Sequence, residues 1–319
     1  MVPAGDIKKF IINCAKFILL VLVVEYAAGS LTGYLFFRQK TGKYARMTHV
    51  IQKDTSDIVI FGSSHAVRHF IPKVFEEETG KTCYNAGARG QRIMFHYTLQ
   101  KLLLERHTPE YIILNIDENW MYESEKEYGR IGDFNPYYGK NKEALHPILS
   151  LDDPLISYKL ALKSYRFNST LVHIGKYALQ PQKDFQGFMP LKEGMSGPDD
   201  PKLKGIPNSA FVSSSDVIDT NFVNAYENFI INALAAGSKL TIVVSPELIF
   251  EEDFAEDKSF KMMKSIAAHH GVQVFDFSDD DDFNGAYHLY ADPNHMNRDG
   301  AALFNGKLID ALKESGVLE

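Results

Sequence analysis

The stretch "IVIFGSSHAVRHF", residues 58–70, decides the fold. Four apolar residues that suit a buried strand end at Gly62, and two serines follow before the chain turns into a helix. A strand that passes through a glycine turn into a helix is typical of a parallel α/β unit. The same stretch leaves one question open. Ser64 could be a nucleophile, or Ser63 or Ser64 could cap the helix.

Further strands and helices alternate along the chain. The apolar run "YIILNI", residues 111–116, has no polar alternation, which suits a parallel sheet covered on both faces. We therefore expect a three-layer α/β/α domain of the flavodoxin-like type, with ligands at the carboxyl ends of its parallel strands. The expected strands are 57–62, 82–87, 111–116, 239–245 and 272–277, and the expected helices are 91–106, 221–236, 257–270 and 298–315.

The regular pattern stops at about residues 120–220, which are rich in Tyr, Phe, Pro and Gly and show at most short helices, such as 154–166. We interpret this stretch as a long insertion in a domain spanning residues 47–319. Its aromatic side chains could stack on sugar rings, but we favour the interpretation that they form a small core of the insertion. These side chains are Trp120, Tyr122, Tyr137, Tyr138, Phe185 and Phe188.

Residues 1–46 are expected to form a membrane anchor and a linker. The segment 10–37 is apolar apart from Lys16, Glu25 and a few small polar residues, and about 20 such residues suffice to cross a bilayer. No clear signal-peptidase site follows it, so we expect an uncleaved anchor; the alternative is a buried amphipathic helix. Glu25 would have to be protonated or face a partner helix. Basic residues flank the segment on both sides, so they do not fix its orientation.

Composition excludes several classes of function. The 319-residue chain has a formal charge of −7, which argues against a nucleic-acid partner. "GARG", residues 87–90, lacks the full G-x-G-x-x-G motif of dinucleotide-binding proteins. The run "DDDD", residues 279–282, is typical of a solvated loop, and His269 and His270 suit a helix end. No metal ion and no cofactor are therefore expected.

A second stretch with potential chemistry is "YADPNHMNRDG", residues 290–300, at the start of the last expected helix. Asp292 and His295 are three residues apart, so the carboxylate could accept the Nδ1 proton of the imidazole and leave Nε2 free as a base. The alternative is an Asp-Pro turn in which Asn297 caps the helix. The usual G-x-S-x-G motif is absent, so an ordinary α/β-hydrolase is not expected.

Two further residues could stabilise an oxyanion. Gly90 follows the second strand, where its N–H could point into the crevice, and Asn119 follows the third strand with an amide that could donate a hydrogen bond. Either residue could instead have a purely structural role, Gly90 as the entry to a helix and Asn119 as a turn residue.

This ordered set resembles the SGNH (GDSL-like) hydrolase superfamily over most of residues 57–316, apart from the insertion. The resemblance implies that Ser64 is the nucleophile and His295 the base, oriented by Asp292. It also implies that the Ser64 N–H, Gly90 and Asn119 form the oxyanion hole. The family often reads Gly-Asp-Ser where this chain has Gly62-Ser63-Ser64, which leaves the hydrogen bonding around Ser64 open.

With an N-terminal span, the chain is similar to membrane-tethered proteins that move acyl groups onto cell-surface polymers. This similarity implies a single-pass membrane protein with an extracytoplasmic domain that hydrolyses or transfers ester-linked acyl groups, acetyl above all, of a polysaccharide. It also implies a multispan membrane acyltransferase as a partner, which Glu25 could contact. The alternative is a catalytically inactive binding or assembly partner of such an acyltransferase.

Overall fold

The computed structural model describes residues 3–203, 217–248 and 257–318. Part of the predicted insertion, residues 204–216, lies outside this range. The chain divides into two compact units: residues 1–45 together with 131–182, and residues 46–130 together with 183–319. The first is called the anchor unit below and the second the sheet unit.

The sheet unit is built on five parallel strands in the order β2-β1-β3-β4-β5. This is the flavodoxin-like order, in which the strand sequence reverses direction between β1 and β3. The register pairs Ile60 with Asn85 on one side and with Ile113 on the other. The strands are β1 (Ile58–Phe61), β2 (Cys83–Asn85), β3 (Tyr111–Asn115), β4 (Lys239–Val244) and β5 (Val274–Asp276).

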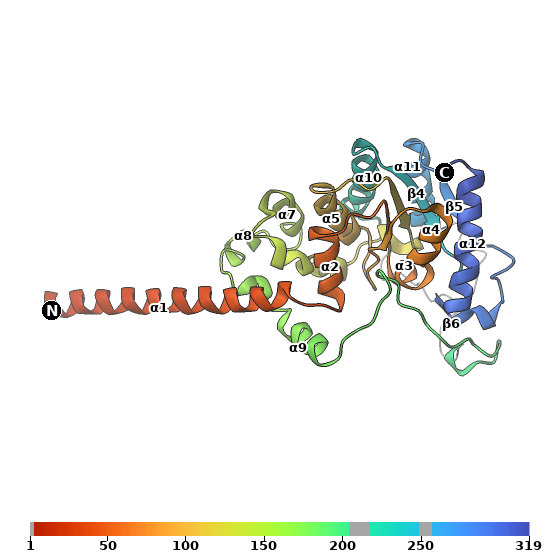
Figure 1. Cartoon of the computed structure of the whole chain (residues 1–319). Coiled ribbons are helices and arrows are strands. Elements are labelled where there is room, and N and C mark those ends of the chain that lie inside the picture. Colours follow the sequence, from red (N-terminus) through yellow and green to blue (C-terminus); the bar gives the residue numbers. More distant parts are fainter. Residues whose placement is uncertain (1–2, 204–216, 249–256, 319) are drawn as a thin grey trace. The chain divides into compact units, whose positions relative to one another are not determined.

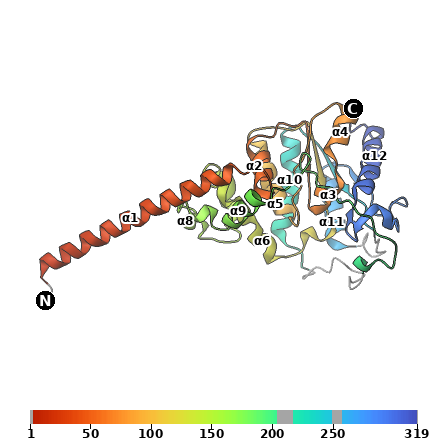
Figure 2. The ribbon, with the colours of Figure 1, turned by 60° about the horizontal axis from the view of Figure 1, so that its bottom comes forward.

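Helices cover both faces of the sheet, so the predicted three-layer fold is confirmed (Figures 1 and 2). On one face, α3 (Ser64–His69) and α4 (Pro72–Thr79) pack against α12 (Arg298–Glu314). On the other face, α10 (Thr220–Ala235) packs between α5 (Ile93–Leu104) and α11 (Lys258–His269). A short antiparallel pair, β6 (Tyr290–Asp292) and β7 (His295–Met296), precedes α12.

Local sequence explains where these elements begin and turn. Side-chain oxygens of Asp219, Asp257 and Asn297 accept backbone N–H groups at the starts of α10, α11 and α12. After β1 the chain turns at Gly62, whose φ is +146°. A Cβ atom at this position would lie 2.8 Å from the Asn115 carbonyl oxygen. Only glycine suits that conformation and that close approach.

The anchor unit joins the N-terminal helix to most of the predicted insertion. Helix α1 (Ala4–Phe37) is long and apolar enough to cross a membrane. Near its C-terminal end, Phe36 is fully buried against Tyr44, Tyr137 and Phe167, with ring centroids 5.1 to 5.8 Å apart. The remaining helices of the insertion are α6 (Glu125–Ile131), α7 (Lys142–Leu149), α8 (Ile156–Lys159), α9 (Leu171–Leu179) and the 3-10 turns Glu118–Met121, Gly132–Tyr137, Tyr165–Phe167 and Pro201–Leu203.

Two more elements complete the description. Helix α2 (Lys43–Gln52) connects the two units in sequence, and a 3-10 turn, Tyr287–Leu289, leads into β6. Five of the six aromatic side chains named in the sequence analysis are buried. Phe185 is 62% exposed, whereas Trp120, Tyr122, Tyr137, Tyr138 and Phe188 are buried.

Candidate active site

The turn between β1 and α3 gives its two serines different roles. Ser63 is the N-cap of α3, and its hydroxyl oxygen accepts the His65 N–H at 3.2 Å. Ser64 is therefore the first residue of the helix, where backbone N–H groups have no partner within the helix. Ser64 is half-buried and lines a cavity of about 690 Å³ in the sheet unit.

The D-x-x-H stretch forms the expected pair. The Asp292 carboxylate accepts the Nδ1–H of His295 at 2.9 and 3.1 Å, and it also accepts the backbone N–H groups of Asn294 and His295. Asn297 caps α12 at the same time, so the structural and the chemical interpretation of this stretch hold together. The proton on Nδ1 leaves Nε2 with a free lone pair.

Nε2 of His295 is buried and has no hydrogen-bond partner among the described residues. Ser64 and His295 line the same cavity, but their side chains are therefore not hydrogen-bonded to each other in this structure. Catalytic hydrogen bonds often tighten only when substrate is bound. The lone pair of His295 is available to a hydroxyl group that enters the cavity.

The two remaining predicted residues line this cavity as well. Gly90 has a φ of +69°, and its carbonyl accepts a hydrogen bond from the Arg130 guanidinium group. Asn119 lies in the 3-10 turn after β3, where its carbonyl accepts Nη1 of Arg92 at 2.8 Å. The structure thus brings Ser64, Gly90, Asn119 and His295 to one cavity, with Asp292 behind His295.

Three charged residues that the sequence analysis did not consider join these two turns. Glu127 is buried, forms an ion pair with Arg130 and lies 3.8 Å from Nε of Arg92. Because Arg92 holds the Asn119 carbonyl and Arg130 holds the Gly90 carbonyl, this cluster fixes both turns relative to each other. Burial raises the pKa of the Glu127 carboxyl, although both guanidinium groups oppose that shift.

His65 and Asp117 form a buried pair beside Ser64. Nδ1 of His65 lies 2.8 Å from the Asp117 carboxylate, which also accepts Nε1–H of Trp120 at 3.1 Å. Burial opposes a positive charge on His65, but the carboxylates of Asp117, Glu247 and Asp292 together outweigh it and raise the pKa of His65 to about 9. His65 is therefore a cation at neutral pH, directly after Ser64 in the sequence.

The cation at His65 affects the protonation of His295. The rings of His65 and His295 have centroids 5.4 Å apart. Burial lowers the pKa of His295, and the positive charge of His65 lowers it further, while the Asp292 carboxylate acts in the opposite direction. A histidine with a lowered pKa is neutral at physiological pH, which is the form that a general base requires.

A third histidine holds the backbone beside His295. Nε2 of His69 accepts the Met296 N–H at 3.0 Å, and its Nδ1 lies 3.0 Å from the Ser245 hydroxyl oxygen. Because Nε2 is an acceptor, the ring proton is on Nδ1. Burial lowers the pKa of His69 well below its ordinary value, so the ring is neutral. His69 thereby positions the residue that follows His295.

No group of three or more His, Cys, Asp or Glu side chains in the described part of the chain is arranged to hold a metal ion. The cavity is lined by the Ser64 hydroxyl, the His295 imidazole and the Asn119 side chain. Its wall also carries charged side chains of both signs, namely Arg92, Glu123, Glu125, Lys126, Glu127 and Arg130.

The fold and the site define a class: a parallel α/β protein of flavodoxin-like topology, with a serine and a His–Asp pair at the edge where the strand order reverses. No protein-family model matches the chain, and no curated protein matches it.

Solved structures with a low degree of similarity exist. One is a Streptococcus pneumonia protein whose name refers to platelet activating factor, with 12% identity over 94% of this chain and 98% of that chain and a TM-score of 0.41. Another is an acetyl xylan esterase, AlAXEase, with 12% identity over 80% of this chain and 99% of that chain and a TM-score of 0.39. At this degree of similarity, a function has to be argued from the site itself.

Proposed function

We propose that the protein is a serine esterase or O-acyltransferase that works through an acyl-serine intermediate. One observation carries the proposal. His295 has Nδ1 held by Asp292 and a bare Nε2, and it shares a cavity with Ser64. A hydroxyl, a neutral imidazole and an orienting carboxylate are the components of nucleophilic acyl transfer.

In the proposed reaction, Nε2 of His295 takes the Ser64 proton as the serine Oγ attacks the ester carbonyl carbon. The carbonyl oxygen becomes an oxyanion, stabilised by the Ser64 and Gly90 N–H groups and the Asn119 amide. The C–O bond of the ester then breaks, and the imidazolium returns its proton to the departing alcohol. Water or another hydroxyl attacks the acyl-serine in the same way, and Ser64 is restored.

The proposed substrates are ester-linked acyl groups, acetyl above all, on a cell-surface polysaccharide. The polar wall of the cavity, with Glu123, Lys126 and Arg130, supports a hydroxyl-rich substrate rather than a lipid. The helix α1 supports attachment to the cell membrane. An extracytoplasmic location is part of the proposal. An alkaline phosphatase fused after residue 319 should be active, and activity of a cytosolic reporter there instead would contradict it.

The proposal is tested by labelling the full chain with a serine-directed fluorophosphonate and mapping the adduct by peptide mass spectrometry. We expect an adduct on Ser64 that is lost in Ser64→Ala. Ser124→Ala is the matched control, because Ser124 lines the same cavity, and it should label as the wild type does. Labelling that persists in Ser64→Ala would contradict the assigned nucleophile.

A second candidate function has its own supporting observation. Ser64 and His295 are not hydrogen-bonded to each other, which also fits a catalytically inactive binding or assembly partner of a multispan membrane acyltransferase. A folded wild-type chain that never labels, alone or with such an acyltransferase, would favour this function. Labelling only in its presence would favour an enzyme whose site the partner completes.

A further inference from the structure

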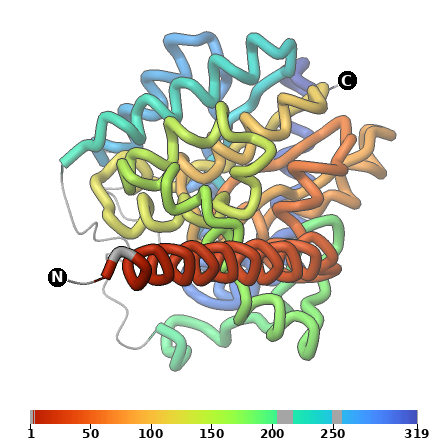
Figure 3. The backbone as a smooth tube through the Cα atoms, turned by 90° about the vertical axis from the view of Figure 1, so that its left-hand side faces the viewer, coloured from red at the N-terminus to blue at the C-terminus, as the bar shows by residue number. Residues whose placement is uncertain are grey.

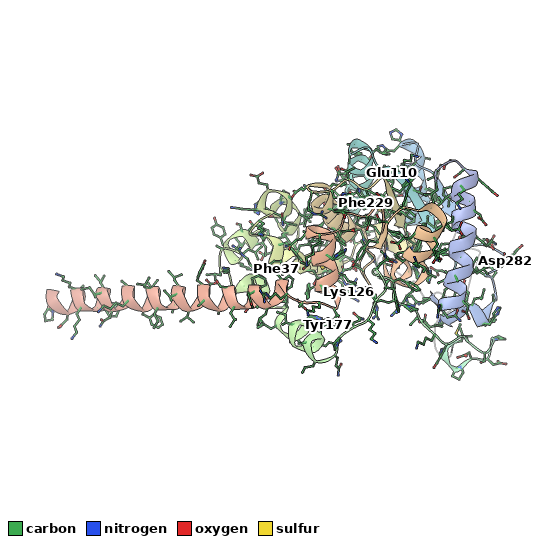
Figure 4. All side chains as sticks on the ribbon, viewed as in Figure 1. Phe37, Glu110, Lys126, Tyr177, Phe229 and Asp282 are labelled. Carbon is green, nitrogen blue, oxygen red and sulfur yellow. The ribbon has the colours of Figure 1, made fainter. Side chains whose placement is uncertain are left out.

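Helix α1 changes character at one point along its length. From Ile7 to Val24 its large apolar side chains are exposed, and Figure 4 shows the side chains of this part of α1 projecting with no other element beside them. Residues 5–24 span about 30 Å at 1.5 Å per residue, which is the thickness of the hydrocarbon core of a bilayer. Residues 5–24, called the bare segment below, are therefore long enough on their own to cross a membrane.

Beyond Val24, one face of α1 is packed against its own unit, whereas Tyr26, Leu31 and Tyr34 on its other side stay exposed. The Glu25 carboxylate accepts the Ser164 N–H at 2.6 Å, and Nζ of Lys163 donates to the Ser30 hydroxyl at 2.8 Å. Gly29 allows this approach, because a Cβ there would lie 2.5 Å from the Ser164 nitrogen. Small residues such as glycine let another segment approach a helix closely within a membrane. The acidic residue of the predicted span thus has a partner within the chain.

A cluster of exposed apolar side chains directly precedes Lys163. Leu151, Leu155, Tyr158 and Leu162 are 44%, 60%, 76% and 44% exposed, and we call them the apolar patch. They lie on α8 and the turns around it, and α8 lies beside α1 in Figures 1 and 2. Single exposed apolar residues are normal, whereas four large ones within twelve residues mark an interaction surface.

The patch is fixed to α1 where the bare segment ends. Lys163 and Ser164 follow Leu162 directly and contact α1 between Glu25 and Ser30. Nζ of Lys163 lies 4.4 Å from the centre of the Tyr26 ring. Lysine and tyrosine are both favoured at membrane–water interfaces. In Figure 3 the turns of residues 140–180 lie beside the red helix α1.

We propose that the apolar patch lies in the surface of the lipid leaflet in which the bare segment of α1 ends. The occupant is lipid, not a protein, because the patch is continuous with a segment that itself has the length and composition of a membrane span. The protein would then be held by a span and by a shallow second contact, which together fix the depth and rotation of the anchor unit. This proposal does not depend on the proposed catalytic function.

Single cysteines test this proposal in the full chain. They are placed at Leu155, Tyr158 or Leu162 in a Cys14→Ser background, and Cys83 is kept because its side chain is buried. Each cysteine carries an environment-sensitive fluorophore, and the protein is reconstituted in phosphatidylcholine vesicles at a low protein-to-lipid ratio. Quenching is measured with spin-labelled lipids, shallow or deep, and with aqueous iodide.

Two control positions calibrate the measurement. Leu20→Cys reports the bare segment of α1, and Glu143→Cys reports an exposed position on α7 of the same unit. We expect the patch positions to be quenched several-fold more by the shallow lipid label than by the deep one. They should be several-fold less accessible to iodide than Glu143→Cys, while Leu20→Cys responds to the deep label.

Three results would overturn the proposal. Iodide quenching at the patch equal to that at Glu143→Cys would place the patch in water. Protection of the patch from both iodide and lipid labels would mean that protein covers it, either a second copy or another part of the chain. Absence of lipid quenching at Leu20→Cys would show that α1 does not cross the bilayer.

Discussion

Ser63 and Ser64 divide two tasks between neighbouring hydroxyl groups. Ser63 caps α3 and is buried, whereas Ser64 is half-buried, and both serines line the cavity. The Asp117 carboxylate lies beside them and forms hydrogen bonds with the side chains of both Ser63 and His65. The hydrogen bonding around the serine pair is therefore supplied from the end of β3.

Under the proposed mechanism, Ser64 and His295 should behave as a unit. Ser64→Ala and His295→Ala should each remove nearly all turnover of a model ester, and the double variant should be little worse, because each change removes the same proton-transfer step. Steady-state kinetics on the full chain measures this. Losses that multiply in the double variant would contradict a shared step.

Asn119 is predicted to act on the transition state. Asn119→Ala should lower kcat about 10²–10³-fold, as loss of an oxyanion-hole donor does elsewhere, with little change in KM. A decrease in kcat of less than about threefold would contradict this role and leave Asn119 as a turn residue only. Asn224→Ala, at an exposed position on α10, is a control that should leave kcat unchanged.

The pH dependence of kcat/KM should report the base. His295 must be neutral to accept a proton, so activity falls as the pH drops through its pKa. Because burial and the His65 charge lower that pKa, the acid limb should lie below the ordinary histidine value of about 6.5. His65→Gln removes the cation and should move the limb to higher pH. His270→Gln, at the end of α11, should not move it.

At the scale of elements, each of the five strands was predicted to within about two or three residues. Runs such as Ile58–Phe61 are buried completely, so their apolar pattern is unbroken and easily recognised. Helix α4 was not predicted, because Pro72 at its start and Gly80 at its end enclose only eight residues. The helices of the insertion were equally short.

The predicted site residues all follow strand ends or precede α12, so the expected topology was enough to place them at one edge of the sheet. His65 and Asp117 could not be paired in the same way. Their contact depends on β1 and β3 being neighbours, and on Ser63 rather than Ser64 capping α3, which orients the first helical turn. The cluster of Arg92, Glu127 and Arg130 depends on the path of the insertion.

One buried amide connects the elements on the α12 face. Oδ1 of Asn305 accepts the Ile71 N–H at 3.0 Å, and its Nδ2 donates to the His69 carbonyl at 2.5 Å. Asn305→Leu leaves both backbone groups buried and unpaired, at a cost of about 1–3 kcal/mol each. Denaturant unfolding should show this loss, whereas exposed Asn228→Leu should change the free energy of unfolding by less than about 0.5 kcal/mol. Equal stability of both variants would contradict the assigned role.

At the scale of the whole molecule, the anchor unit is assembled from two separate parts of the chain. Gly29→Leu should force Lys163 and Ser164 away from α1, since even a Cβ there would lie 2.5 Å from the Ser164 nitrogen. Limited trypsin digestion in detergent should then cut faster after Lys163. Gly5→Leu is the matched control, because no described atom lies within 4 Å of a Cβ at that position. An unchanged digestion pattern for Gly29→Leu would contradict this packing.

The order in which a ribosome makes the chain gives the two-part anchor unit a consequence for biosynthesis. Helix α1 is complete before any of residues 131–182 exists, and the whole of 46–130 is made in between. During that interval the face with Gly29 and Gly33 has no cover, and the Glu25 carboxylate has no backbone N–H to accept. This face of α1 is therefore covered only after Lys163 and Ser164 have been made, long after the helix itself.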